Sequence, residues 1–213
     1  MVEAGWARRL YVFAKAPLMG RAKTRLAKDI GGGAAMNFYR RESARVLKGL
    51  GQDKRWRTIL AYDRPEALGF ARPPALPAAP QGAGDLGARM GRVFASAPPG
   101  PVVIIGGDIP GVSPGHIAAA FRKLMSADAV VGPAPDGGYW LIGLKRIKER
   151  PGLFASQVFQ GVRWSSSYAL RDTLAGMPES LRVERLGVLQ DVDTQADYKD
   201  YIHAGPVSRM RGR

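Results

Sequence analysis

Carboxylates stand at two places where an expected strand ends. Asp108 follows the apolar, β-branched run Val102–Ile105 and two glycines, and Asp191 and Asp193 follow the expected last strand, Val183–Leu189. Open α/β sheets bind their ligands at the edge where such strands end. A carboxylate there can hold a divalent cation or a substrate hydroxyl, but Asp also starts turns and caps helices. The residues alone leave both interpretations of Asp108 open.

The pair Asp191 and Asp193 is equally ambiguous. If the backbone stays extended, the two side chains point to opposite sides, so one of them can turn inward toward a metal. Alternatively, Asp193 or Thr194 caps a final short helix over Gln195–Ile202. Which of the two carboxylates would reach a metal is not decided by the sequence.

A basic loop, residues 15–26, follows the first expected strand. It carries four cationic side chains, Lys15, Arg21, Lys23 and Arg25. Pro17 and Gly20 set its turns, and a helix is expected beyond it. A strand that leads into such a loop is typical of phosphate binding by backbone N–H groups and cations. The loop is neither a Walker A nor a GxGxxG sequence, and a solvated basic loop is the alternative.

Two glycine-rich segments offer further contacts. Gln81–Gly87 precedes a helix and can bring backbone close to a sugar or a base, although Asp85 could equally be the N-cap of that helix. Asp136-Gly137-Gly138 can form a tight hairpin turn. Together with the aromatic residues that follow, the same segment could instead form the wall of an acceptor pocket.

The elements that must position these residues alternate along the chain. The expected strands are Leu10–Ala14, Thr58–Tyr62, Val102–Ile105, Ala129–Val131, Leu141–Leu144 and Val183–Leu189. The expected helices are Gly33–Leu50, Leu86–Ala95, Pro114–Met125, Ser166–Ala175 and Gln195–Ile202. Arg64–Pro80 is expected to be an irregular excursion. The alternation predicts one three-layer α/β/α domain with a mostly parallel sheet over residues 1–203, followed by a basic, disordered tail at 204–213.

Composition narrows the function classes. The chain has 213 residues, enough for a substantial core, and no cysteine, which excludes disulfides, thiolate metal sites and a cysteine nucleophile. No convincing signal peptide or membrane-spanning run is found, so a cytoplasmic protein is expected. The net charge is +14, and residues 1–60 hold fourteen Lys and Arg against four Asp and Glu. This excess favours a polyanionic partner, either nucleic acid or a nucleotide phosphate chain.

With these motifs, the sequence resembles the bacterial GT-A-type transferases known as rSAM/selenodomain-associated, or arsenosugar-biosynthesis-type, transferases. The matching segments are VFAKAPLMGRAKTRL at 12–26, QGAGDLGARM at 81–90, VIIGGDIPGVSP at 103–114, VVGPAPDGGYWLIGL at 130–144, Phe159–Ser166 with its Trp-Ser-Ser, and LQDVDT at 189–194. They cover nearly the whole chain. The sequence is more distantly similar to nucleotidyltransferases that activate phospholactate or molybdenum-cofactor precursors.

The resemblance implies a nucleotide-diphospho-sugar transferase fold and assigns roles to the motifs. The implied nucleotide contacts are Lys15, Gly20, Lys23 and Arg25 at the phosphates, and Gln81, Gly84 and Asp85 near the base and ribose. Asp108 and Asp193 are the implied metal ligands. The chain has Gly107 where the family pattern places a small polar residue before the Asp, which leaves the surroundings of the metal ligand less defined.

The expected chemistry is metal-assisted transfer from a nucleotide donor to a small acceptor. One Mg²⁺ or Mn²⁺, held by Asp108 and Asp193, would bridge the diphosphate, and Lys23 would add to the stabilisation of its charge. Asp136 would orient or deprotonate the acceptor hydroxyl beside Tyr139. The implied acceptor contacts are Gly137, Gly138 and Tyr139.

Two enzyme functions remain open on this reasoning. Glycosyl transfer would release a nucleoside diphosphate, whereas nucleotidyl transfer from a nucleoside triphosphate to a phosphorylated acceptor would release pyrophosphate. A third function, non-catalytic binding of nucleic acid, is disfavoured because no nucleic-acid-binding motif is found. No membrane partner is expected, and the sequence does not define the donor base, the sugar, the acceptor or the oligomeric state.

Overall fold

The computed structural model describes residues 6–68, 76–146 and 157–203. Its strands are β1 (Arg9–Ala14), β2 (Arg57–Tyr62), β3 (Ala78–Pro80), β4 (Gly100–Gly106), β5 (Ala129–Pro133), β6 (Tyr139–Arg146) and β7 (Val183–Arg185). Its helices are α1 (Thr24–Ile30), α2 (Gly32–Gly51), α4 (Leu86–Ser96), α5 (Pro114–Ser126), α7 (Ala169–Ala175) and α8 (Gln195–His203). None of the helices in these ranges is both long and apolar enough to cross a membrane.

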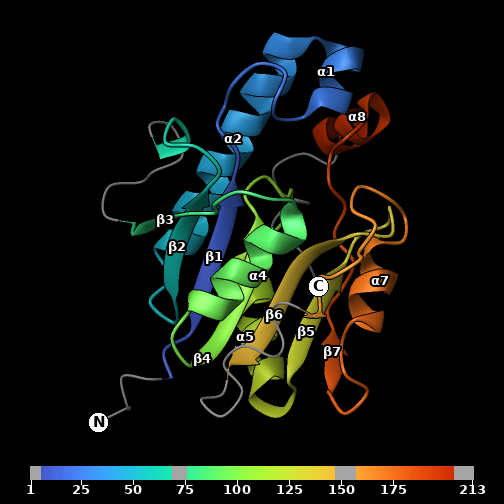
Figure 1. Ribbon diagram of the computed structural model, residues 1–213. Helices are drawn as coiled ribbons and strands as arrows, with labels where there is room; N and C mark the ends of the chain where they lie inside the picture. Colours follow the sequence, from blue (N-terminus) through green and yellow to red (C-terminus); the bar gives the residue numbers. More distant parts are fainter. Residues whose placement is uncertain (1–5, 69–75, 147–156, 204–213) are drawn as a thin grey trace.

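The strands form one seven-stranded sheet in the order β3-β2-β1-β4-β6-β5-β7. β6 runs antiparallel to both of its neighbours, and every other pairing is parallel. The prediction of a single α/β domain with a mostly parallel sheet is therefore confirmed. The parallel strands β1, β2 and β4 bring their carboxyl ends to one edge of the sheet, and the basic loop and Asp108 both start there (Figure 1).

Alternating side chains of β1 divide the core between the two faces of the sheet. Leu10, Val12 and Ala14 pack in one cluster with buried residues of α2 and α5, whereas Tyr11 and Phe13 pack in another with α4 and α7. This is the two-residue period that a strand buried on both faces must have. Figure 1 shows α4 in front of the sheet and α2 and α5 behind it, which gives the expected three layers.

A third, smaller cluster joins helices α1 and α2 to α8. Leu26 of α1 and Phe38 of α2 pack with Val192, Tyr198 and Tyr201 in and before α8. The rings of Tyr198 and Tyr201 each meet Phe38 edge to face, with centroids 5.6 and 5.1 Å apart. Because of this packing, the segment that carries Asp191 and Asp193 returns to the basic loop (Figure 1).

Several element boundaries differ from the sequence expectations. The basic loop ends earlier than expected, because α1 begins at Thr24. The last strand stops at Arg185 rather than Leu189, because only Val183–Arg185 pairs with β5. Within the stretch expected to be irregular, Ala78–Pro80 adds the edge strand β3, while residues 69–75 lie outside the described part. The expected tail at 204–213 also lies outside the described residues.

Candidate functional site

Lys23 is the point at which the separate acidic motifs meet. Its Nζ lies 2.9 Å from Oδ2 of Asp108, contacts Oδ1 of Asp191 and lies 3.6 Å from Oδ1 of Asp193. Arg25 adds a second cation, with its Nη1 3.7 Å from Oδ2 of Asp193. The structure therefore brings together carboxylates from the ends of two distant segments and cations from the first loop.

Lys23 has an unusual backbone conformation for a residue with a side chain. It precedes the first residue of α1 and adopts the left-handed conformation, with φ 50° and ψ 44°. A non-glycine residue in this region costs of order 1 kcal/mol or more, and such strain gathers at functional sites. The side chain is only 3% exposed, and its ammonium lies 6.0 Å from the centre of the Phe38 ring. A buried ammonium of this kind requires the carboxylates around it.

Burial and mutual charge shift the protonation of this cluster. Burial lowers the pKa of Lys23, but the nearby Asp108 and Asp191 carboxylates raise it more strongly, so the pKa ends above its ordinary value and the side chain stays charged. The pKa of Asp191 rises to about 6 because the carboxyl is desolvated and faces Asp108, although Lys23 opposes that rise. The site thus holds more negative charge than its single buried ammonium balances.

The structure settles which residues cap the helices near the acidic motifs. Ser113 is the N-cap of α5, and its backbone N–H donates to Nδ1 of His116 at 3.2 Å. Thr194 and Asp197 bond each other at the start of α8, where the N–H of Asp197 donates to Oγ1 of Thr194 at 3.2 Å. Asp108, Asp191 and Asp193 are therefore released from capping. The backbone at 190–193 is not a strand, so both Asp191 and Asp193 reach Lys23.

Gly107 is explained by how closely the chain passes β1. A Cβ at this position would lie 2.9 Å from the carbonyl oxygen of Phe13, a backbone atom that cannot give way cheaply. The N–H of Gly107 donates to the same oxygen at 2.8 Å. The missing side chain therefore lets Asp108 start directly from the sheet edge, and the expected small polar residue would not fit here.

Gly107→Ala is accordingly expected to reduce the free energy of unfolding by about 2 kcal/mol, the usual cost of overpacking. Urea denaturation monitored by circular dichroism measures this change. Gly49→Ala is the matched control, because Gly49 lies inside α2 with nothing within 4 Å of its added Cβ. In that control the free energy of unfolding is expected to rise by about 0.5–1 kcal/mol, because Ala has a higher helix propensity than Gly. Equal effects of the two substitutions would contradict this account of Gly107.

A pocket of about 670 Å³ opens in front of the Lys23 cluster. All four basic residues predicted for the first loop line it: Lys15, Arg21, Lys23 and Arg25. Asp191 and Asp193 line it as well, whereas Asp108 reaches it through Lys23. Gly20 adopts φ +76° between Lys15 and Arg21, which fits its predicted turn. The start of the loop is tied to α2, because the N–H of Lys15 donates to the Tyr39 hydroxyl at 2.7 Å.

The residues predicted near the base and ribose do not line this pocket. The amide of the buried Gln81 donates to the carbonyls of Ala14 and Ala61, at 3.2 and 2.8 Å, and so ties two strand ends together. Asp85 is the N-cap of α4 and accepts from the N–H of Ala88 at 2.8 Å. The capping interpretation of Asp85 is thus confirmed. Gly84 adopts φ +100° beside it, and nucleotide binding by these three residues stays a prediction.

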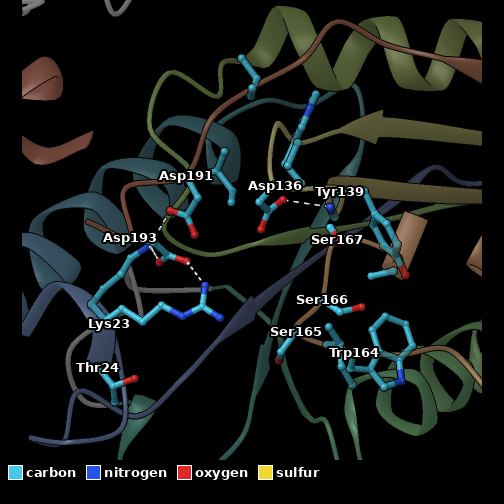
Figure 2. A pocket seen from close by; sticks show the side chains of 18 of the residues that line it. Lys23, Thr24, Asp136, Tyr139, Trp164, Ser165, Ser166, Ser167, Asp191 and Asp193 are labelled. Carbon is cyan, nitrogen blue, oxygen red and sulfur yellow. Dashed lines mark hydrogen bonds and ion pairs between the residues drawn. The ribbon is translucent and has the colours of Figure 1, made fainter. Parts of the chain in front are cut away.

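The acceptor residues predicted from the sequence lie at the opposite side of the pocket from Lys23 (Figure 2). Asp136, Gly138 and Tyr139 line it, and Gly137 lies just behind. Asp136 also closes the predicted hairpin turn between β5 and β6, because it accepts from the N–H of Gly138 at 2.9 Å. The Tyr139 hydroxyl pairs with Oγ1 of Thr173 at 3.3 Å, and burial raises the pKa of this phenol.

Sequence reasoning missed part of this wall. Trp164, Ser165, Ser166 and Ser167 line the pocket, whereas the sequence predicts only a family motif over Phe159–Ser166 and a helix over Ser166–Ala175. α7 instead begins at Ala169, with Tyr168 as its N-cap. The Trp-Ser-Ser sequence was the available signal, but only the tertiary packing shows that it faces Lys23 across the pocket (Figure 2).

The donor chemistry of the Lys23 cluster fits a hard divalent cation. Its three carboxylates offer only oxygen ligands, which Mg²⁺ and Mn²⁺ prefer and zinc does not require. In the part of the chain that the structure describes, no three acidic, His or Cys side chains form a preassembled metal group. The carboxylates are oriented by the Lys23 ammonium instead. A metal would thus share them with Lys23.

Asp191→Asn is expected to stabilise the metal-free protein at pH 7. The pKa of Asp191 rises from 3.8 to about 6 on folding, so the folded state binds its proton more tightly. This contribution stabilises the fold below about pH 4 and is lost as the pH rises through 6. Because 37% of the side chain is exposed, solvent screening reduces the gain in the variant to about 1 kcal/mol.

Thermal unfolding in EDTA between pH 4 and pH 7 measures this effect. The difference between wild type and Asp191→Asn is expected to grow across that range and then level off. Asp200→Asn, an exposed carboxylate on α8, is the control and is expected to change little. A difference that stays constant with pH would show that Asp191 does not titrate in this window.

The fold and this pocket define a class of protein. The single α/β domain with its seven-stranded, mostly parallel sheet is the GT-A-like arrangement seen in nucleotidyltransferase and nucleotide-sugar transferase structures. The chain belongs to the DUF2064 family, described as an uncharacterized protein conserved in bacteria, whose model matches residues 46–166. No curated protein matches the sequence.

Several solved structures are similar to this chain in fold, and one of them also in sequence. It is 30% identical to a "putative nucleotide-diphospho-sugar transferase" from Desulfovibrio desulfuricans G20, over 96% of this chain and 90% of that one, with a TM-score of 0.81. The 4-diphosphocytidyl-2C-methyl-D-erythritol synthase from Anaerococcus prevotii DSM 20548 shares 11% identity over 94% and 97%, with a TM-score of 0.58. The inositol-1-phosphate CTP transferase from T. maritima shares 12% over 98% and 98%, with a TM-score of 0.57. The last two show the fold alone.

Proposed function

We propose that this protein is a metal-dependent transferase that moves a glycosyl group from a nucleotide-diphospho-sugar to a small acceptor. One observation carries the proposal: the buried Lys23 ammonium bridges Asp108, Asp191 and Asp193 at the edge of a pocket lined by further cations. Such a site pairs cations for a diphosphate with carboxylates for a hard metal. The 30% identity to the D. desulfuricans protein supports glycosyl transfer as the reaction.

Each side chain has a role in this proposal. Lys15, Arg21 and Arg25, which are exposed at the pocket, bind the phosphate oxygens, and Lys23 stabilises the charge that collects on the leaving diphosphate. Asp108 and Asp193 would hold Mg²⁺ or Mn²⁺, with Asp191 beside them. When bound, the metal would neutralise charge on the diphosphate.

The reaction itself exchanges one bond for another. The bond between the anomeric carbon and the diphosphate oxygen breaks, and the acceptor oxygen forms a new bond to that carbon. Asp136 lines the pocket with an exposed carboxylate and accepts the proton that the acceptor hydroxyl loses. Gly138 and Tyr139 beside it contact the acceptor, and Gly137 holds the turn. The nucleoside diphosphate leaves.

Nucleotidyl transfer is the second candidate, because the fold is shared with CTP-dependent transferases. The same cations and carboxylates would then act at the α-phosphorus of a nucleoside triphosphate. Nucleic-acid binding is less supported, since four basic side chains of the first loop line a pocket. We further propose that residues 1–203 form the transferase unit and that the chain shares the rSAM/selenodomain association its motifs suggest.

A thermal-shift screen of nucleotides and nucleotide sugars, with and without Mg²⁺ or Mn²⁺, tests the proposal. A true ligand at about 100 times its Kd raises the free energy of unfolding by about 2.7 kcal/mol. The wild-type shift is expected to depend on the metal and to vanish in Asp108→Asn, while Asp200→Asn on α8 keeps it.

A product assay then separates the two reactions. Release of a nucleoside diphosphate from a nucleotide sugar supports glycosyl transfer. Release of pyrophosphate from a nucleoside triphosphate in the presence of a phosphorylated acceptor would contradict glycosyl transfer and support nucleotidyl transfer. Unchanged nucleotide binding by Asp108→Asn, together with tight DNA binding at physiological salt, would support the nucleic-acid function instead.

A further inference from the structure

Opposite the Lys23 cluster, the pocket has a wall of different chemistry. Figure 2 shows Trp164, Tyr139 and three serines, Ser165, Ser166 and Ser167, on the side away from Asp191 and Asp193. The charged side suits phosphates, whereas aromatic rings and hydroxyls suit an uncharged group that carries many hydroxyls. The pocket therefore has two halves that would recognise two parts of one ligand.

This wall is held in place by contacts that allow only glycine. A Cβ on Gly137, at φ +82°, would lie 2.1 Å from the carbonyl oxygen of Ser167. A Cβ on Gly87 of α4 would lie 2.7 Å from Cζ2 of Trp164. The carbonyl of Gly137 also accepts from the N–H of Leu170 at 2.9 Å. Two separate segments, the turn at Gly137 and helix α4, thus pack against the Trp164–Ser167 loop and hold it in place.

The backbone of the loop is strained at Ser165, which adopts φ 58°. Among the described residues, Lys23 and Ser165 are the non-glycine residues with positive φ, and both line the pocket. Strain of this kind costs about 1–3 kcal/mol and gathers at ligand-binding sites. Strained backbone is therefore present in both walls of the same pocket, at Lys23 and at Ser165.

The orientation of Trp164 shows what it can offer a ligand. Its indole N–H is buried and has no hydrogen-bond partner in the described part of the chain, so the ring cannot present that group to the pocket. The Tyr139 ring meets it edge to face with centroids 6.4 Å apart. Ser165 and Ser167 are exposed beside it. An apolar ring flanked by hydroxyls matches a sugar ring, which has C–H faces and a rim of hydroxyls.

We propose that Trp164 and Ser165–Ser167 bind the sugar that the nucleotide donor carries, with the Trp164 ring against the C–H face of the sugar. This inference rests on the proposed function, because it assumes that the nucleotide phosphates occupy the charged half of the pocket. It assigns donor-sugar specificity to a loop far in sequence from the phosphate and metal motifs.

Isothermal titration of nucleoside diphosphates and of the corresponding glucose and N-acetylglucosamine esters, in Mn²⁺, tests this inference. For wild type, at least one sugar ester is expected to bind about tenfold more tightly than its nucleoside diphosphate. Trp164→Ala is expected to lose that tenfold advantage while its affinity for the nucleoside diphosphate stays unchanged. Tyr168→Ala is the matched control, because this exposed aromatic lies in the same segment but stacks on Arg163 rather than lining the pocket.

A second variant keeps the test valid if loss of the indole unfolds the loop. Ser165→Gly removes a hydroxyl at a position whose positive φ glycine adopts freely, so it leaves the packing intact. It is expected to lower the affinity for the sugar ester about threefold and to leave nucleoside diphosphate binding unchanged. Equal weakening of both ligands in Trp164→Ala and Ser165→Gly, or no advantage of any sugar ester in wild type, would overturn the inference alone. Failure of every nucleotide to bind wild type would overturn the proposed function as well.

Discussion

Lys23→Met is expected to weaken nucleoside diphosphate binding by about 10- to 150-fold, the largest loss we expect from any basic side chain of the pocket. The substitution removes the buried ammonium at the edge of the pocket, whose pKa the surrounding carboxylates hold high so that the side chain stays charged. A hydrogen bond to a charged group contributes about 1.5–3 kcal/mol, which corresponds to that loss in affinity. Titration calorimetry in Mn²⁺ measures it.

The same substitution is expected to change how the protein responds to metal. Without Lys23, Asp108, Asp191 and Asp193 face one another with no buried cation, which destabilises the fold by about 3 kcal/mol. A divalent cation can replace the lost charge, so Mn²⁺ is expected to raise the melting temperature of Lys23→Met more than that of wild type. Lys28→Met, an exposed lysine in the last turn of α1, is the control. An identical response to Mn²⁺ in all three proteins would rule out a shared metal site.

The sequence was sufficient to predict the sheet and the place of Asp108. An apolar β-branched run buried on both faces, followed by two glycines, left few alternatives for Val102–Ile105, and β4 is buried almost throughout. Because parallel strands end at one edge, Asp108 and the basic loop had to meet there. The antiparallel direction of β6 was not predicted, although the possible hairpin turn at Asp136-Gly137-Gly138 was its signal, since parallel strands need a longer crossover.

The centre of the site could not be predicted, because it depends on contacts between distant residues. Nothing local distinguishes Lys23 from the other cations of its loop, yet it alone among the four is buried, since the segment before α8 returns against Phe38. The role of Asp191 depends on backbone after β7 that is not extended. Trp164 faces the pocket only because Gly87, far away in the sequence, leaves room for its ring.

Arg45→Met is expected to lower the free energy of unfolding by about 3 kcal/mol, although Arg45 lies outside the pocket. Its guanidinium donates to the carbonyls of Ile109 and Val112, at 3.0 and 3.1 Å, which bracket the loop that follows Asp108. It also donates to Oε2 of Glu42 at 2.8 Å, and the Glu42 side chain is nearly fully buried. Loss of Arg45 leaves that buried carboxylate without a cationic partner, which typically costs 3–5 kcal/mol, and the partial exposure of Arg45 favours the lower end.

Glu42 also ties this contact to α8, because it accepts a hydrogen bond from the Tyr201 hydroxyl. The double variant Arg45→Met with Glu42→Gln removes both charges and is expected to recover part of the lost stability in urea denaturation. Arg41→Met, an exposed residue of α2, provides the background value. If the double variant is no more stable than Arg45→Met alone, the cost comes from the freed Ile109–Val112 loop rather than from the buried charge. In both the single and the double variant, the carbonyls of Ile109 and Val112 lose the hydrogen bonds from Arg45 that hold the loop after Asp108. Nucleotide binding in Mn²⁺ is therefore expected to weaken together with the stability of the fold.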